Sequence, residues 1–224
     1  MDKPHLDITF VSDVACPWCA IGLASLEQAL SRTRDAIDVS VRIEPFELNP
    51  DMGPEGKEVV PYLARKYGRT PAQIAQTQAM LRERGAAVGF QFGARNHVWN
   101  TLDAHRMLYW AGTVGRALDL KRALLRAYHG EGRNPAAPDV LVEAAASVGL
   151  DAERAREIVA SREFEPEVRA REQFWLQQGV NGVPFVVVNG RHAIEGAQPP
   201  EVFEQALREI ARPQASAAGL TSAG

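Results

Sequence analysis

Residues 13–22 read DVACPWCAIG and contain the only two cysteines of the chain, Cys16 and Cys19. The preceding residues 6–11 are dominated by β-branched and aromatic side chains with apolar residues at alternate positions, which predicts a strand. The following residues 17–33 carry apolar side chains at helical spacing. The cysteine pair therefore stands where a strand turns into a helix. A helix N-terminus offers unpaired N–H groups and the positive end of the helix dipole, and both favour a reactive thiolate.

The order of the two cysteines predicts their roles in disulfide exchange. Cys16 comes first, so its sulfur can accept N–H groups of the first turn, and we expect it to be the exposed, acidic nucleophile. Pro17 takes the first helical position, where its missing N–H costs nothing. Cys19 lies one turn further on and is expected to be the buried thiol that resolves a mixed disulfide. Trp18 is expected to be partly exposed and to shield the pair from one side.

Two other interpretations of the pair are weaker. Many zinc sites contain two cysteines at this spacing, but they need two more ligands at a matching spacing. The histidines of this chain are scattered and form no ligand pair: His5, His97, His105, His129 and His192. We therefore predict no metal site. A pair of inert core cysteines would not explain their position at a strand-to-helix junction.

The rest of the chain predicts one interrupted α/β domain. Residues 38–46 read as a second strand, and strands return at 183–188 and 191–195, joined by the hairpin dipeptide Asn189-Gly190. Between them lie predicted helices at 71–88, 101–113, 116–129, 139–148, 151–161 and 166–178, and a last helix is expected at 201–211. We therefore predict a thioredoxin fold interrupted by an all-helical insert. Residues 1–49 and 181–212 would form the thioredoxin-like domain, 50–180 the insert domain, and 213–224 a mobile tail.

Composition excludes several classes of function. The chain has 224 residues and a net charge of −3, and it shows no basic stripe with interleaved aromatics, so we expect no nucleic-acid partner. No apolar run approaches the roughly 20 residues of a membrane helix, so we expect no membrane association. The N-terminus passes directly into the first predicted strand without the apolar core of a signal peptide, which predicts a cytoplasmic protein. The oligomeric state cannot be predicted.

Pro184 opens a buried apolar strand, where a proline is unusual. A cis peptide bond after Val183 is one explanation, and an ordinary trans proline at a strand start is the other.

Four segments together resemble the DsbA family of the thioredoxin superfamily, and more closely its FrnE-like branch. They are residues 13–22, residues 100–106 (NTLDAHR), residues 179–185 (GVNGVPF) and residues 196–199 (GAQP). The resemblance implies a thiol–disulfide oxidoreductase whose partners are thiol- or disulfide-bearing proteins or glutathione. It implies no cofactor other than the redox-active Cys16–Cys19 disulfide, with glutathione as a candidate co-substrate. It also implies that Pro184 is cis and packs beside the cysteines, and that the Val183 backbone pairs with an extended substrate segment.

The resemblance also directs attention to supporting residues. Relatives often bury an acid near the second cysteine, where it moves the proton of that thiol. The first strand here has apolar residues nearest the site, so Asp13 is the candidate proton relay. The alternative role of Asp13 is that of a turn residue. Asn100 or Thr101 is the expected N-cap of a helix that overlooks the cysteines. We expect His105 on this helix to line the cleft, where it could stabilise a thiolate, with Trp99 as apolar wall. The alternative for His105 is a packed or solvated histidine.

Two alternative functions stay open at this point. One is a glutathione-dependent isomerase of the 2-hydroxychromene-2-carboxylate type, although such enzymes usually lack the intact cysteine pair. The other is a non-enzymatic binding or chaperone-like protein for thiol-bearing partners.

Overall fold

The computed structural model describes residues 3–212. The predicted mobile tail, residues 213–224, lies outside the described residues. The main sheet has the strand order β2–β1–β5–β6, formed by β1 (His5–Ser12), β2 (Asp38–Pro45), β5 (Phe185–Val188) and β6 (His192–Glu195). Strand β1 pairs in parallel with β2 and antiparallel with β5, which pairs antiparallel with β6. The hairpin between β5 and β6 turns at Asn189 and Gly190, both with positive φ, as a tight two-residue turn requires.

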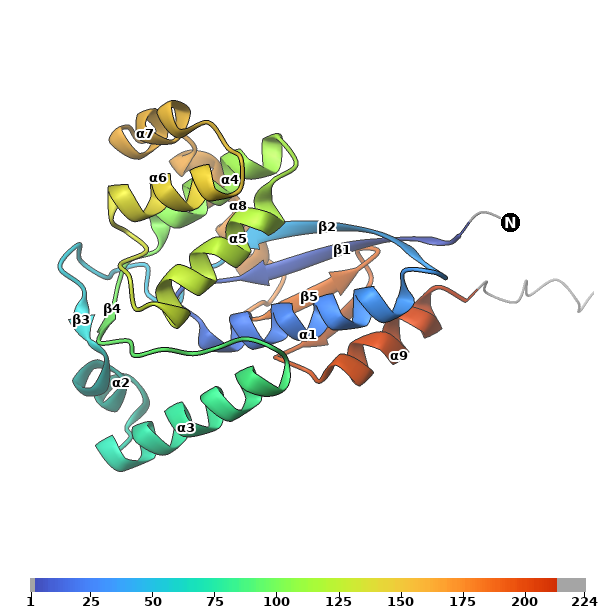
Figure 1. Ribbon diagram of the computed structural model, residues 1–224, viewed down its shortest axis with the longest axis horizontal. Helices are drawn as coiled ribbons and strands as arrows, with labels where there is room; N and C mark the ends of the chain where they lie inside the picture. Colours follow the sequence, from blue (N-terminus) through green and yellow to red (C-terminus); the bar gives the residue numbers. More distant parts are fainter. Residues whose placement is uncertain (1–2, 213–224) are drawn as a thin grey trace, which may run out of the picture.

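Two helices cover one face of this sheet (Figure 1): α1 (Pro17–Thr33) and α9 (Pro200–Ile210), which also contact each other. Alternation along β1 explains the packing, because Leu6, Ile8 and Phe10 point into the same apolar cluster as α1 and α9. The opposite face is covered by a smaller cluster that joins Val11 of β1 to Trp175 of α8 (Glu165–Gln177).

The segment between β2 and β5 is largely helical, which confirms the predicted α/β fold with a helical insert. Its elements are β3 (Lys57–Glu58), α2 (Val59–Tyr67), α3 (Pro71–Ala87), β4 (His97–Val98), α4 (Leu102–Thr113), α5 (Ala117–Leu125), η1 (Arg126–Gly130), α6 (Pro138–Ser147), α7 (Ala152–Ala160) and α8. The two-residue ladder of β3 and β4 and the helix α2 were not predicted. The predicted helix 116–129 is interrupted, because its last turn widens into the π-helix η1.

The insert packs tightly on the loop that carries the cysteines. Helices α4 to α7 enclose an apolar cluster that includes Val14 and Ala15, the residues just before Cys16. Leu125 of α5 instead joins the cluster beneath α1. In Figure 1, α4 to α7 lie above the start of α1, while α2 and α3 lie below it. None of the helices in residues 3–212 is long and apolar enough to cross a membrane.

Candidate active site

The turn from β1 into α1 is held by the carboxylate of Asp13. One oxygen, Oδ1, accepts hydrogen bonds from the Ala15 N–H at 3.0 Å and from the Thr101 hydroxyl at 2.8 Å. The other, Oδ2, accepts the Leu48 N–H at 2.8 Å. These bonds join the turn to the segment that follows β2 and to the start of α4, which fixes the position of the following cysteine.

Cys16 is the N-cap residue of α1, with extended backbone angles (φ −87°, ψ 113°), and Pro17 follows in the first turn. Its thiol donates a hydrogen bond to the carbonyl oxygen of Val183, with an Sγ-to-oxygen distance of 3.4 Å. Both cysteines are free thiols in this structure. The position of the pair at the helix start is therefore as predicted, and the fold brings Val183 onto it from 167 residues away.

The predicted exposure of Cys16 is wrong. Its residue exposure is 3%, against 0% for Cys19, so both cysteines are buried. The Val183 carbonyl covers the Cys16 sulfur, a contact that no local sequence signal reveals. Trp18 is half-buried, as predicted, and the Arg84 guanidinium lies over its ring at 5.5 Å from the centroid.

Burial raises the pKa of the Cys19 thiol well above its ordinary value, and the neighbouring Cys16 raises it further by a hydrogen bond and by its charge. The positive charge of Lys121 and a hydrogen bond from the Asp13 backbone act in the opposite direction. Cys19 is therefore held as a neutral thiol while Cys16 is reduced.

The peptide bond between Val183 and Pro184 is cis, as the resemblance implied. The Pro184 ring is buried and lies against Gly22 of α1: a Cβ atom built at Gly22 would be 2.8 Å from Cγ of Pro184. A glycine is thus needed at this point of the helix for the proline loop to approach it. Gly22 is a site residue that the sequence analysis did not single out.

His105 is packed in the interior, so its predicted place on the wall of the active-site cleft is wrong and the alternative of a packed histidine holds. Its residue exposure is 2%, and Nε2 lies 3.3 Å from Oδ1 of Asp13. Burial alone would raise the pKa of Asp13, but the hydrogen bond and charge of His105 and the Leu48 and Ala15 N–H groups bring this pKa below its ordinary value. Asp13 is therefore an ionised anchor for the turn; a role in proton relay stays a prediction.

Asn100 and Trp99 hold the start of α4 and the neighbouring ladder together. The Asn100 side chain accepts the Leu102 N–H at 2.8 Å and donates to the Met52 carbonyl at 3.2 Å. The predicted capping therefore comes from Asn100, while Thr101, at the N-cap position, donates its hydroxyl to Asp13. The half-buried Trp99 stacks on His97 with ring centroids 5.0 Å apart.

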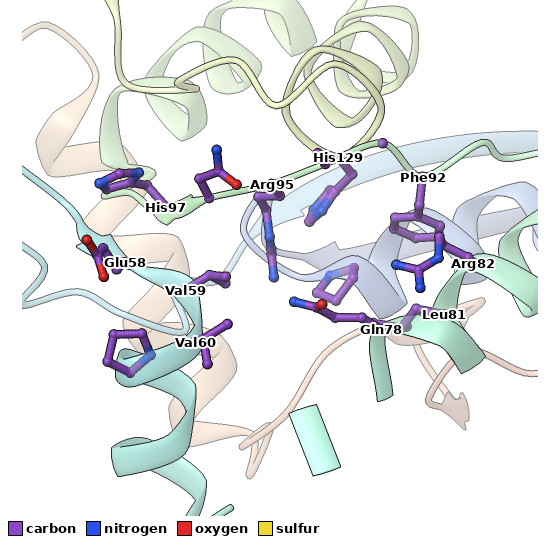
Figure 2. A pocket seen from close by; sticks show the side chains of 15 residues that line it. Glu58, Val59, Val60, Gln78, Leu81, Arg82, Phe92, Arg95, His97 and His129 are labelled. Carbon is purple, nitrogen blue, oxygen red and sulfur yellow. The ribbon is translucent and has the colours of Figure 1, made fainter. Parts of the chain in front are cut away.

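A cavity of about 630 Å³ opens beside Pro17. Figure 2 shows Arg95 reaching into it between Val59 and Val60 on one side and Gln78 and Leu81 on the other. Its charged lining residues are Arg82, Arg95 and Glu58; the lining residue His129 has a pKa held well below its ordinary range, chiefly by burial. The cavity therefore carries net positive charge next to the cysteine pair. Neither arginine was predicted from the sequence to be a site residue.

Within residues 3–212, no group of three or more histidine, cysteine or acidic side chains is arranged to hold a metal ion. What the site offers is a thiol pair at a helix start, a cis-proline loop against it and a basic cavity at its side.

Comparison with known proteins identifies the family. Residues 7–208 match the model of the DsbA-like thioredoxin domain. The chain belongs to the DsbA family. It is similar to the structure of a "probable DsbA oxidoreductase" of Streptomyces coelicolor, with 35% identity, coverage of 98% of this chain and 94% of the other, and a TM-score of 0.84.

Two more distant structures share the fold. The cytosolic disulfide reductase DsbM of Pseudomonas aeruginosa, determined with GSH, is 19% identical, with a TM-score of 0.61 and coverage of 91% of this chain and 98% of the other. A 2-hydroxychromene-2-carboxylate isomerase is 13% identical, with a TM-score of 0.71 and coverage of 91% and 95%. Of these two structures that share the fold, one is named as a disulfide reductase and the other as an isomerase.

Proposed function

We propose that this DsbA-family protein is a thiol–disulfide oxidoreductase in which Cys16 attacks and Cys19 resolves. The observation that carries the proposal is the position of Cys16, which caps α1 and donates its thiol to the Val183 carbonyl beside the cis-Pro184 bond. In the forward direction the Cys16 thiolate attacks a substrate disulfide, forms a mixed disulfide and releases one substrate thiolate. Cys19 then displaces the second substrate thiolate and closes the Cys16–Cys19 disulfide, so the substrate is reduced and the pair is oxidised.

The surroundings of Cys19 support this order. While Cys16 is a thiol or thiolate, its hydrogen bond and charge raise the pKa of Cys19. A mixed disulfide at Cys16 carries neither the proton nor the charge, so both of these effects disappear when the substrate is attached. Cys19 would therefore become easier to deprotonate at the moment when its attack is needed.

The Val183 backbone is the proposed contact for a protein substrate. Its carbonyl oxygen accepts the Cys16 thiol in the reduced protein. Once the Cys16 sulfur is part of a mixed disulfide it has no proton to donate, and the carbonyl becomes free to accept an N–H of an extended substrate segment. The direction of exchange depends on the reduction potential of the pair; a cytoplasmic location, expected from the sequence, would favour reduction.

Glutathione is the proposed small partner. The cavity beside Pro17 contains Arg82 and Arg95, and guanidinium groups pair well with the carboxylates of such a thiol. The structure of the DsbM reductase was determined with GSH, which gives a precedent on the same fold.

The test compares Cys19→Ser with Cys16→Ser. With a disulfide-bearing protein substrate, Cys19→Ser should accumulate a mixed disulfide on non-reducing gels, because the attacking thiol is present and the resolving one is gone. Cys16→Ser should form none above the level of the double serine variant. Equal trapping by the two single variants would refute the assignment of roles. Isomerase or binding activity that survives in the double variant would favour one of the alternative functions.

A further inference from the structure

Lys121 of α5 is the most unusual charged residue outside the cysteine turn. Its residue exposure is 0%, and among the described residues Nζ has no hydrogen-bond partner. A buried ammonium without partners costs several kcal/mol (about 3 or more) in a protein interior, so such residues are rare unless the charge has a use.

The helix places this charge toward the cysteine pair. Leu118 and Leu125 lie three residues before and four residues after Lys121, on the same face of α5, and both pack in the cluster that contains Ala20. Ala20 directly follows Cys19 in α1. Lys121 therefore lies on the face of α5 that packs toward α1.

The titratable groups near Lys121 come from three elements. Cys16 and Cys19 belong to α1 and its cap, Asp13 to the preceding turn, and His129 to η1. Asp13 is already bound by the donors of the turn and by His105, and His129 donates to the Val14 carbonyl at 2.8 Å. Burial lowers the pKa of Lys121, while the charges of Cys19, Asp13 and Cys16 raise it.

We propose that Lys121 is a positioning residue for the resolving step, in which its ammonium stabilises the thiolate of Cys19 inside the protein. This inference rests on the proposed function and adds to it. Cys19 loses its proton, its thiolate attacks the Cys16 sulfur of the mixed disulfide, and the bond from Cys16 to the substrate breaks. The departing substrate thiolate takes up a proton from solvent, which balances the one that Cys19 released. The residues of β1 nearest the cysteines are apolar, so the buried ionisable group near Cys19 comes from the insert, as Lys121 of α5.

The proposal predicts that replacing Lys121 affects the rate of the resolving step without lowering the stability of the fold. Lys121→Met replaces the ammonium by an apolar side chain of similar length, so the protein should be no less stable to urea than the wild type. The loss of the nearby positive charge should raise the pKa of Cys19 further, and the resolving step at neutral pH should become about tenfold slower.

The experiment follows both thiol exchanges in one stopped-flow trace. Reduced protein is mixed with dithiobis(nitrobenzoate), whose released thiolate absorbs visible light. The attack of Cys16 releases one equivalent, and resolution by Cys19 releases the second. In Lys121→Met the first phase should keep its rate and the second should slow about tenfold. Lys121→Arg, which restores the charge, should recover most of the second rate.

A parallel titration isolates Cys19. In the Cys16→Ser background, the thiolate absorbance of Cys19 should titrate at higher pH when Lys121 is methionine than when it is lysine. Unchanged second-phase rates in both Lys121→Met and Lys121→Gln would overturn the inference, as would loss of the fold in both variants, which would make Lys121 a structural residue. Failure of the proposed function has a different signature: the wild-type protein itself would then show no two-step release.

Discussion

Nε2 of His105 lies 3.3 Å from Oδ1 of Asp13, and both side chains are inaccessible to solvent. The two residues are 92 positions apart, one in the turn before Cys16 and the other in α4 of the insert. This contact fastens the insert to the loop that carries the nucleophile. His105 therefore supports the site from behind and has no surface to offer a substrate.

The first prediction follows from this contact. His105→Ala should lower the free energy of unfolding by on the order of 3 kcal/mol, because it leaves the buried Asp13 carboxylate without one of its partners. Urea denaturation measures the loss. The exposed His192 of β6 is the matched control, and His192→Ala should change stability by less than about 0.5 kcal/mol. If His105→Ala were as stable as the wild type but had an altered substrate preference, His105 would line the cleft and this prediction would be wrong.

The sequence predicted best what depends on neighbouring residues. Helix α1 runs over the predicted residues because a strand pattern, a first-turn proline and an apolar stripe lie in one short segment. The capping box of α3, with Thr70 and Gln73, and the turn at Asn189 were also local signals. These features need no knowledge of the rest of the chain.

The parts that were missed depend on distant contacts. The contacts of His105 with Asp13 and of Cys16 with Val183 join residues far apart in the chain, and no periodicity reveals either pair. Lys121 is different, because a signal was present: it shares the apolar face of Leu118 and Leu125. A lysine on the apolar face of a helix could have been recognised as a buried charge.

The second prediction concerns the contact between α1 and the proline loop. Gly22→Ala should destabilise the protein and slow disulfide exchange, since its Cβ would come within 2.8 Å of Cγ of the rigid Pro184 ring. Gly112 of α4 is the matched control, because a Cβ there meets only the Ala117 Cβ, at 3.9 Å. Gly112→Ala should be neutral or stabilising by up to about 1 kcal/mol. Equal effects of the two substitutions would mean that the Gly22 contact has no role.

The third prediction concerns a buried pair of acids behind β2. Glu47 and Glu172 share the Arg169 guanidinium, and each has one carboxyl oxygen that is buried without a hydrogen-bond partner among the described residues. Burial, followed by the charge of Glu172, raises the pKa of Glu47 from 4.5 to about 7. Between these two values the folded protein holds a proton that the unfolded chain has released, so unfolding becomes easier as pH rises.

Stability should therefore fall between pH 4.5 and about pH 7, and Glu47→Gln should remove part of this fall. The difference in unfolding free energy between wild type and Glu47→Gln should change by about 2 kcal/mol between pH 5 and pH 8, with the variant gaining at the higher pH. Urea denaturation across this pH range measures it. Parallel pH profiles for the two proteins would contradict the raised pKa.

The fourth prediction concerns the basic cavity beside Pro17. Arg82 is the better residue to replace than Arg95, because Arg82 is exposed on α3 whereas Arg95 donates to the Ala15 carbonyl at 3.3 Å and supports the cysteine turn. Arg82→Gln should slow exchange with glutathione disulfide, which carries carboxylates, by about two- to fivefold, the range expected when one partly exposed charge pair is lost. Exchange with the uncharged bis(2-hydroxyethyl) disulfide should stay unchanged.

Two controls make this comparison specific to the cavity. Arg156→Gln removes another exposed positive charge, on α7 and outside the cavity beside Pro17, and should leave both rates unchanged. Added salt should narrow the difference between wild type and Arg82→Gln with glutathione disulfide, because exposed charges are screened. If Arg82→Gln slowed both disulfides equally, the cavity would be acting through the geometry of the thiol pair, and the carboxylate-binding site for glutathione would have to be sought on another side of Cys16.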